Sequence, residues 1–166
     1  MKDKKVLFLV QSAMIAAIYV VLTLMFAPIS FGPIQTRISE ALTILPFFTP
    51  AAVPGLFVGC LLGNILGGAA LPDIIFGSLA TLLGAVITYM LRNRNRFFAP
   101  VPPILANAII IPFVLYYAYG MHSPIPYMML TVGLGEVLTA GVFGMILLFV
   151  LDRYKEHIFG SYALQN

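Results

Sequence analysis

The sequence predicts an all-α, polytopic membrane protein, folded as one compact bundle of six helices. Three observations predict this class: an apolar composition, a series of apolar segments separated by glycine and proline, and basic residues confined to a few short clusters. The 166 residues are 61% hydrophobic and 9% charged, whereas a soluble domain is about 45–50% apolar and about 25% charged. Such a small share of charged residues cannot cover a water-exposed surface. Lipid must therefore surround most of the protein. The length fits a single domain, residues 1–166.

Six apolar segments are predicted to form the helices. A helix needs about 20 mostly apolar residues to cross a hydrocarbon core of about 30 Å, and the second segment is clearly shorter than this. Pro46, Pro50 and Pro54 separate it from the third segment. Pro112 predicts a kink in the fifth. In chain order the segments are 6–27, 38–48, 51–68, 74–91, 104–119 and 127–151.

The basic residues predict the topology. Eight of the nine lie in three clusters, at 2–5, at 92–96, and at Arg153 and Lys155, while the ninth is Arg37. Basic residues that flank apolar segments mark cytoplasmic loops. Four crossings between the first two clusters and two more before the third bring all three to the cytoplasmic side. Both termini are therefore predicted to be cytoplasmic; without the short second helix, one cluster would lie outside.

Small residues predict close contacts between helices. Gly55, Gly59 and Gly63 begin a stripe that repeats every four positions in the third segment, and such stripes let helix backbones approach closely in lipid. The stripe fits packing inside the bundle, with a moving interface as the alternative. Ala13 and Ala17 form a similar pair toward the cytoplasmic end of the first segment.

A buried charge in the last segment predicts a ligand contact. An ionised side chain at the centre of a membrane helix costs about 2.5–3.5 kcal/mol even on a lenient scale, so such residues tend to be functional. Glu136 lies about 15 Å from the outer end of its segment, at about 1.5 Å per residue. It shares a stripe with Gly133, Ala140 and Gly144, which predicts that it faces protein. A purely structural partner is the alternative.

Other polar residues map to the same outer half. Arg37 and Glu40, three residues apart, fit either a mutual ion pair or a ligand site. Asp73 follows Pro72, where it would either cap a helix or bind ligand. A few polar groups within apolar walls are typical of a small-molecule pocket, here open to the outside. The predicted substrate-binding residues are Gln35, Arg37, Glu40, Asn64, Asp73, Asn107, Tyr117 and Glu136.

Three of these residues have an alternative role. Asn64 and Asn107 would equally serve as hydrogen-bonding contacts between helices. Tyr117 belongs to a group of tyrosines that fits an interfacial aromatic belt as well as a surface on which a flat ligand stacks.

Motifs for catalysis, metal binding and nucleotide binding are missing from the sequence. It contains no Gly-x-x-x-x-Gly-Lys-Ser/Thr loop, so the chain is not expected to hydrolyse ATP itself. His122 and His157 lie far apart, and Cys60 is the single cysteine, so no metal site is expected. The net charge of +3 comes from loop clusters, which argues against nucleic-acid binding. We expect no catalytic residue and no cofactor.

One stretch resembles a known family. Residues 31–46 read FGPIQTRISEALTILP and resemble the signature of the QueT family. The resemblance extends over most of the chain, through the glycine-striped third segment, Pro72-Asp73, and Gly133 to Glu136. It implies the substrate-binding S component of an energy-coupling factor (ECF) transporter in the bacterial plasma membrane, with an outward-facing site associated with queuosine precursors. It also implies a transmembrane coupling subunit and two ATPase subunits as partners, with Ala13 and Ala17 matching the Ala-x-x-x-Ala docking motif.

The implied ligand fits the acidic residues. A 7-deazaguanine has a donor edge, N1–H and an exocyclic amine, which one carboxylate accepts at two points. Glu136 is expected to make this contact or to bind a cationic tail. If Arg37 and Glu40 neutralise each other, Asp73 and Glu136 leave the pocket negative, which favours an aminomethyl substituent. Two other classes stay open: a stand-alone secondary transporter of a small amphipathic metabolite, and a structural membrane protein that binds no ligand.

Overall fold

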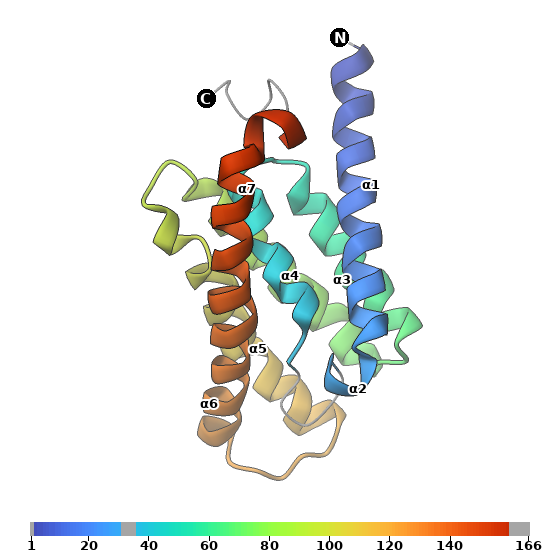
Figure 1. Cartoon of the computed structure of the whole chain (residues 1–166). Coiled ribbons are helices and arrows are strands. Elements are labelled where there is room, and N and C mark those ends of the chain that lie inside the picture. Colours follow the sequence, from blue (N-terminus) through green and yellow to red (C-terminus); the bar gives the residue numbers. More distant parts are fainter. Residues whose placement is uncertain (1, 31–35, 160–166) are drawn as a thin grey trace.

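The computed structural model describes residues 2–30 and 36–159, and nearly all of them lie in helices (Figure 1). The long single helices are α1 (Lys2–Met25), α3 (Ala52–Leu66), α4 (Leu71–Met90) and α5 (Val101–Ala118). The last rod is continuous and consists of α6 (Ile125–Glu136), the π-helix η3 (Val137–Phe143) and α7 (Gly144–Phe159). Short elements complete the order: α2 (Ala27–Ser30) and the 3₁₀ helices η1 (Ile38–Phe47) and η2 (Arg96–Phe98).

Four described helical segments are long and apolar enough to cross a membrane. They are Lys4–Met25, Leu71–Met90, Arg96–Ala118 and Ile125–Tyr154. Large apolar side chains such as Leu9, Leu66 and Met90 are exposed on their surfaces and on α3, as expected for a protein that faces lipid. The prediction of an all-helical, polytopic membrane protein is confirmed.

The second predicted helix is a 3₁₀ helix rather than an α-helix. Pro46 lies inside this helix and donates no backbone hydrogen bond to it, because proline has no backbone N–H. At about 2.0 Å per residue, ten residues of 3₁₀ helix extend about 20 Å, compared with about 15 Å for an α-helix. The segment therefore reaches further than its length suggests. 3₁₀ runs of this length are uncommon.

The core lies around η1. This helix is surrounded by α1, α3, α4, η3 and α7, and Figure 1 shows it between α1 and α7. Its residues from Ser39 to Pro46 are all buried. Ile44 is completely buried and packs in one cluster with Leu56 of α3 and Leu148 of α7. Residues 37–47 thus carry polar side chains into the centre of the bundle.

The glycine stripe of α3 packs inside the protein, against α1. A Cβ at Gly55 would lie 2.7 Å from the carbonyl oxygen of Ser12, and one at Gly59 would lie 2.8 Å from the Cβ of Tyr19. Only glycine permits these approaches. The stripe therefore packs inside the bundle, and the contact between α3 and α1 fixes the position of Tyr19.

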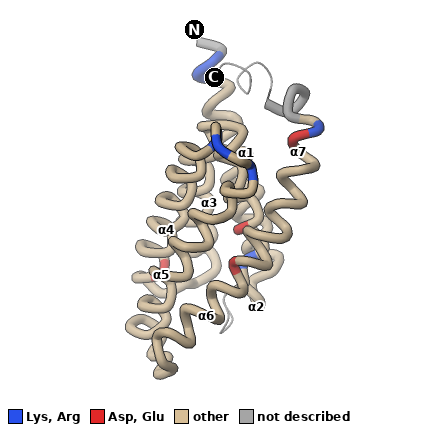
Figure 2. The backbone as a smooth tube through the Cα atoms, turned by 90° about the vertical axis from the view of Figure 1, so that its left-hand side faces the viewer, with Lys and Arg blue, Asp and Glu red and all other residues tan. Residues whose placement is uncertain are grey.

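The charges divide between one end of the bundle and its interior (Figure 2). The first turns of α1, the η2 loop and the end of α7 lie toward the same end, where the basic segments are. Acidic segments and one basic segment lie midway along the bundle. This interior group defines the candidate site.

Candidate functional site

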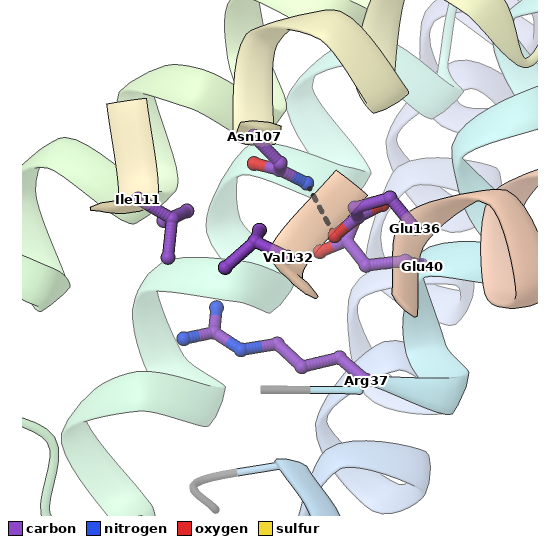
Figure 3. Close-up of a pocket in the computed structure, with 6 residues that line it drawn as sticks. All are labelled: Arg37, Glu40, Asn107, Ile111, Val132 and Glu136. Atoms are coloured by element: carbon purple, nitrogen blue, oxygen red, sulfur yellow. Dashed lines mark hydrogen bonds between the residues drawn. The ribbon is translucent and has the colours of Figure 1, made fainter. Parts of the chain in front are cut away.

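Six side chains from three parts of the chain enclose a small cavity (Figure 3). Arg37 and Glu40 come from the start of η1, Asn107 and Ile111 from α5, and Val132 and Glu136 from α6. All four polar members are at most 4% exposed. The free volume of about 10 Å³ is room for about one water molecule.

Two carboxylates in this cavity each have one oxygen without a partner in the part of the chain that the structure describes. Asn107 Nδ2 donates to Glu136 Oε1 at 2.9 Å, and the hydroxyl of Tyr19 donates to Glu40 Oε1. Among the described residues, Glu40 Oε2 and Glu136 Oε2 accept no hydrogen bond. In Figure 3 the two carboxylates lie side by side, below the amide of Asn107. A buried acceptor without a donor is unfavourable, so the cavity suits a ligand that brings N–H donors.

The helix that carries Glu136 widens directly after this residue. The π-helix η3 begins at Val137, and π-helical turns often occur at functional sites. Glycine lowers the local preference for a regular α-helix, and Gly133, Gly135 and Gly141 lie within or just before this turn. The glycine-rich sequence thus permits an irregular backbone next to the buried carboxylate.

Arg37 forms an ion pair with Asp73. Its Nη2 lies 3.2 Å from Asp73 Oδ2 and 3.3 Å from Oδ1. Tyr119 donates to Asp73 Oδ2 at 3.0 Å, and Asn64 Nδ2 donates to the backbone carbonyl of Asp73 at 3.3 Å. Burial raises the pKa of the Tyr119 phenol, and the charge of Asp73 adds to this effect, so Tyr119 stays protonated as a donor.

The structure differs from one of the two expectations for Arg37 and Glu40. A mutual ion pair was one alternative, but Arg37 bonds to Asp73 and Glu40 accepts from Tyr19. Arg37 precedes η1 and has an extended backbone, with φ −96° and ψ 112°. The helical spacing of three residues therefore does not bring the two side chains onto one face. With Glu136 included, three buried carboxyl groups and one guanidinium lie in this part of the interior.

Gly77 makes room for the ion pair. A Cβ at this position would lie 2.9 Å from Asp73 Oδ1 and 3.3 Å from Asn64 Nδ2. A larger residue would displace the carboxylate that bonds to Arg37. The Oδ1 atom of Asn64 has no hydrogen-bond partner among the described residues, so the polar group around Asp73 also retains an unused acceptor.

The structure brings six of the eight predicted site residues together. Asn64 and Asp73 join the cavity residues Arg37, Glu40, Asn107 and Glu136 through the ion pair of Arg37. Gln35 lies outside the described residues.

Tyr117 lies apart from this group. It is 77% exposed and borders an apolar groove with Phe76 and Phe113. Its ring contacts that of Tyr116. This position suits the aromatic-belt interpretation better than stacking in the cavity.

The sequence analysis did not include Tyr19 in the site. Tyr19 is almost completely buried and bonds to Glu40 across the interface between α1 and η1. A signal was present: Ser12, Tyr19 and Thr23 follow one face of the first helix at helical spacing. Ala13 and Ala17 lie on a different face of this helix and are exposed.

The fold and the cavity define a membrane protein with a small, buried cavity lined by two carboxyl groups. Comparison with known proteins makes this specific: residues 9–153 match the family model described as "QueT transporter". The chain therefore belongs to the QueT transporter family. Membership in a transporter family agrees with the expectation that this protein is not an enzyme.

A curated relative carries a more specific name. The chain is 36% identical over 98 residues to the "Queuosine precursor transporter QueT" of Lactococcus lactis subsp. cremoris (strain MG1363). The match covers 58% of this chain and 57% of the relative, so it spans little more than half of that protein. No solved structure matches the chain.

Proposed function

We propose that this protein is the substrate-binding S component of an ATP-driven ECF importer, and that it takes up a queuosine precursor of the 7-deazaguanine class. The observation that carries the proposal is the pair of carboxylate oxygens, Glu40 Oε2 and Glu136 Oε2, that have no donor among the described residues of a buried cavity. Membership in the QueT family and the name of the Lactococcus relative support the substrate class.

The chemistry of a deazaguanine complements these acceptors. Its N1–H and exocyclic amine are adjacent donors, and an aminomethyl substituent adds a cation. Glu136 would accept from the donor edge or pair with the cation, and Glu40 would take the remaining donor. The O6 atom of the deazaguanine would accept hydrogen bonds from the side-chain amides of Asn64, Asn107 and Gln35.

Binding requires the cavity to expand. Pockets for small molecules have volumes of about 300–1,000 Å³, whereas the cavity measures about 10 Å³. The cavity is formed by residues beside the 3₁₀ helix η1 and the π-helix η3. These are less regular than an α-helix, and in this proposal they move apart to admit the ligand.

The proposed architecture is one domain, 1–166, with six crossings of the bacterial plasma membrane and both termini in the cytoplasm. The two short crossings are η1 and α3, and the site opens to the outer side. The positions of the basic segments at one end support this orientation (Figure 2).

The orientation is tested by cysteine labelling. In a Cys60→Ser background, Arg94→Cys should remain unlabelled by a membrane-impermeant maleimide added outside intact cells, and should be labelled after lysis. His122→Cys is the matched control, because His122 is also exposed and lies between α5 and α6. It should be labelled in intact cells. Labelling of Arg94→Cys from outside would contradict the topology.

The partner contact is tested at α1. Ala13 and Ala17 are exposed and lie away from the α3 interface, which leaves them accessible to a coupling subunit. Leucine at both positions should reduce transport at least 10-fold, because the added bulk prevents close helix approach. Deazaguanine binding by the isolated chain should stay within about twofold. Val86→Leu, on an exposed part of α4, is the control; normal transport by the double variant would refute the contact.

The function itself is tested by binding and reconstitution. Calorimetry on the purified chain should show binding of 7-aminomethyl-7-deazaguanine, and transport in proteoliposomes should require the coupling subunit, the ATPases and ATP. Uptake by this chain alone, driven by an ion gradient, would instead establish the secondary transporter. A failure to bind any deazaguanine would reject the substrate class.

A further inference from the structure

A second cavity lies at the basic end of the bundle. It has a volume of about 410 Å³ and is lined by Phe47, Arg94, Asn95, Arg96, Leu148 and Asp152. These residues come from the end of η1, the segment before and into η2, and α7. The cavity is within the size range of ligand pockets, about 300–1,000 Å³, and it shares no residue with the cavity around Glu136.

The backbone holds the two arginines around this cavity. Asn95 caps η2, since its Oδ1 accepts a hydrogen bond from the backbone N–H of Phe97 at 3.2 Å. Arg94 and Arg96, on either side of Asn95, both line the space. The cap thus fixes the turn that presents two guanidinium groups to one cavity.

Arg96 is oriented but retains capacity to bind an anion. Its guanidinium lies 5.6 Å from the ring centre of Phe149, and its Nη1 lies 3.3 Å from Asp152 Oδ2. This ion pair is well exposed, at 48% for Arg96 and 33% for Asp152, and exposed pairs contribute little to stability. A guanidinium has five N–H donors, so Arg96 can contact a second anion while it keeps Asp152.

The electrostatics and the surrounding surface favour one class of ligand. Two guanidinium groups against one carboxylate leave the cavity positive, and guanidinium binds phosphate oxygens at two points. Phe97 and Phe98, beside these arginines in the chain, are 61% and 54% exposed. Exposed aromatic side chains that follow these arginines in the chain suit a molecule with an anionic head and acyl chains.

We propose that this cavity binds the headgroup of an anionic phospholipid, with its acyl chains against Phe97 and Phe98. Basic pockets between membrane helices on the cytoplasmic side bind such headgroups. A soluble phosphate compound would make no use of the two phenylalanines, and an acidic protein partner would not need a concave site. The site is independent of the proposed transport function.

The test is native mass spectrometry of the full-length protein titrated with phosphatidylglycerol or phosphatidylcholine of the same acyl chains. Phosphatidylglycerol should bind at least 10-fold more tightly. Arg94→Gln combined with Arg96→Gln should bring its affinity down to that of phosphatidylcholine. Lys5→Gln combined with Arg153→Gln removes the same charge from exposed positions outside the cavity and should retain the preference within about twofold.

Four results would overturn the proposal. Equal binding of the two lipids by the wild-type protein would show no headgroup recognition, and an equal loss in both double variants would show a general charge effect. Displacement of phosphatidylglycerol by equimolar inorganic phosphate would show a soluble-anion site, and an effect of Arg94 and Arg96 on partner assembly with none on lipid binding would show a protein-docking surface. Deazaguanine binding should be unchanged in the Arg94/Arg96 variant, which separates this site from the transport site.

Discussion

Replacing Glu136 with glutamine is expected to weaken binding of 7-aminomethyl-7-deazaguanine by about 30-fold or more, the effect of losing a buried charged partner worth about 2–5 kcal/mol. Glutamine keeps the shape of the side chain, and its carbonyl oxygen can still accept from Asn107 Nδ2, as Glu136 Oε1 does. Its amide nitrogen then replaces Oε2, the oxygen that accepts no hydrogen bond from any described residue. A donor would face the donors of the ligand.

Two ligands separate the roles that Glu136 could have. If Glu136 accepts from the N1–H and amine edge, the aminomethyl and the uncharged cyano derivatives should lose similar affinity. If it pairs with the aminomethyl cation, only the cationic ligand should weaken. Calorimetry on the purified protein distinguishes these results, provided that the melting temperature of the variant stays close to that of the wild type.

Asp152→Asn is the matched control for this experiment, because Asp152 is an acidic residue at the other cavity. Its replacement should leave deazaguanine binding unchanged. Wild-type affinity of the Glu136→Gln variant for both ligands would remove Glu136 from the site. Tighter binding of an anionic vitamin than of any deazaguanine would overturn the substrate class.

The members of the polar group were predictable from sequence, but their pairing was not. Charged residues in apolar segments are costly, so Arg37, Asp73 and Glu136 are conspicuous in this sequence. Arg37 and Asp73, however, are 36 residues apart and meet through tertiary packing. The backbone before η1 is extended at Arg37, and no helical periodicity encodes that conformation. Tyr19 was overlooked because a tyrosine in an apolar helix usually suits the interface.

The positions of the long helices were predicted better than the type of helix found within each segment. The expected segment 74–91 corresponds to α4 (Leu71–Met90), where Pro72 occupies the first turn. The expected segment 127–151 corresponds to a rod interrupted by the π-helix η3. Apolar periodicity indicates that a helix is present, but it does not distinguish 3₁₀, α and π forms over a few residues. The irregular forms occur at Glu40 and directly after Glu136, so they matter for the proposed site.

Replacing Arg37 with methionine is expected to destabilise the protein by about 3–5 kcal/mol, the cost of leaving a buried charge without its partner. Methionine preserves much of the volume of the side chain and removes the guanidinium. Asp73 is completely buried, and it would keep the hydroxyl of Tyr119 but no cation from Arg37. The thermal unfolding midpoint in detergent should fall sharply. Arg96→Met, which breaks the exposed pair with Asp152, should cost about 1 kcal/mol or less.

A second substitution identifies the partner of Arg37. Asp73→Asn in the Arg37→Met background removes the stranded charge and can still accept from Tyr119, so it should restore much of the lost stability. Glu40→Gln in the same background leaves the Asp73 carboxyl group without its partner and should restore less, because Glu40 is bonded to Tyr19. Such coupling between contacting residues is what a double-mutant cycle measures. Rescue by Glu40→Gln but not by Asp73→Asn would mean that Glu40 is the functional counter-charge of Arg37, and that Asp73 is left to face the ligand.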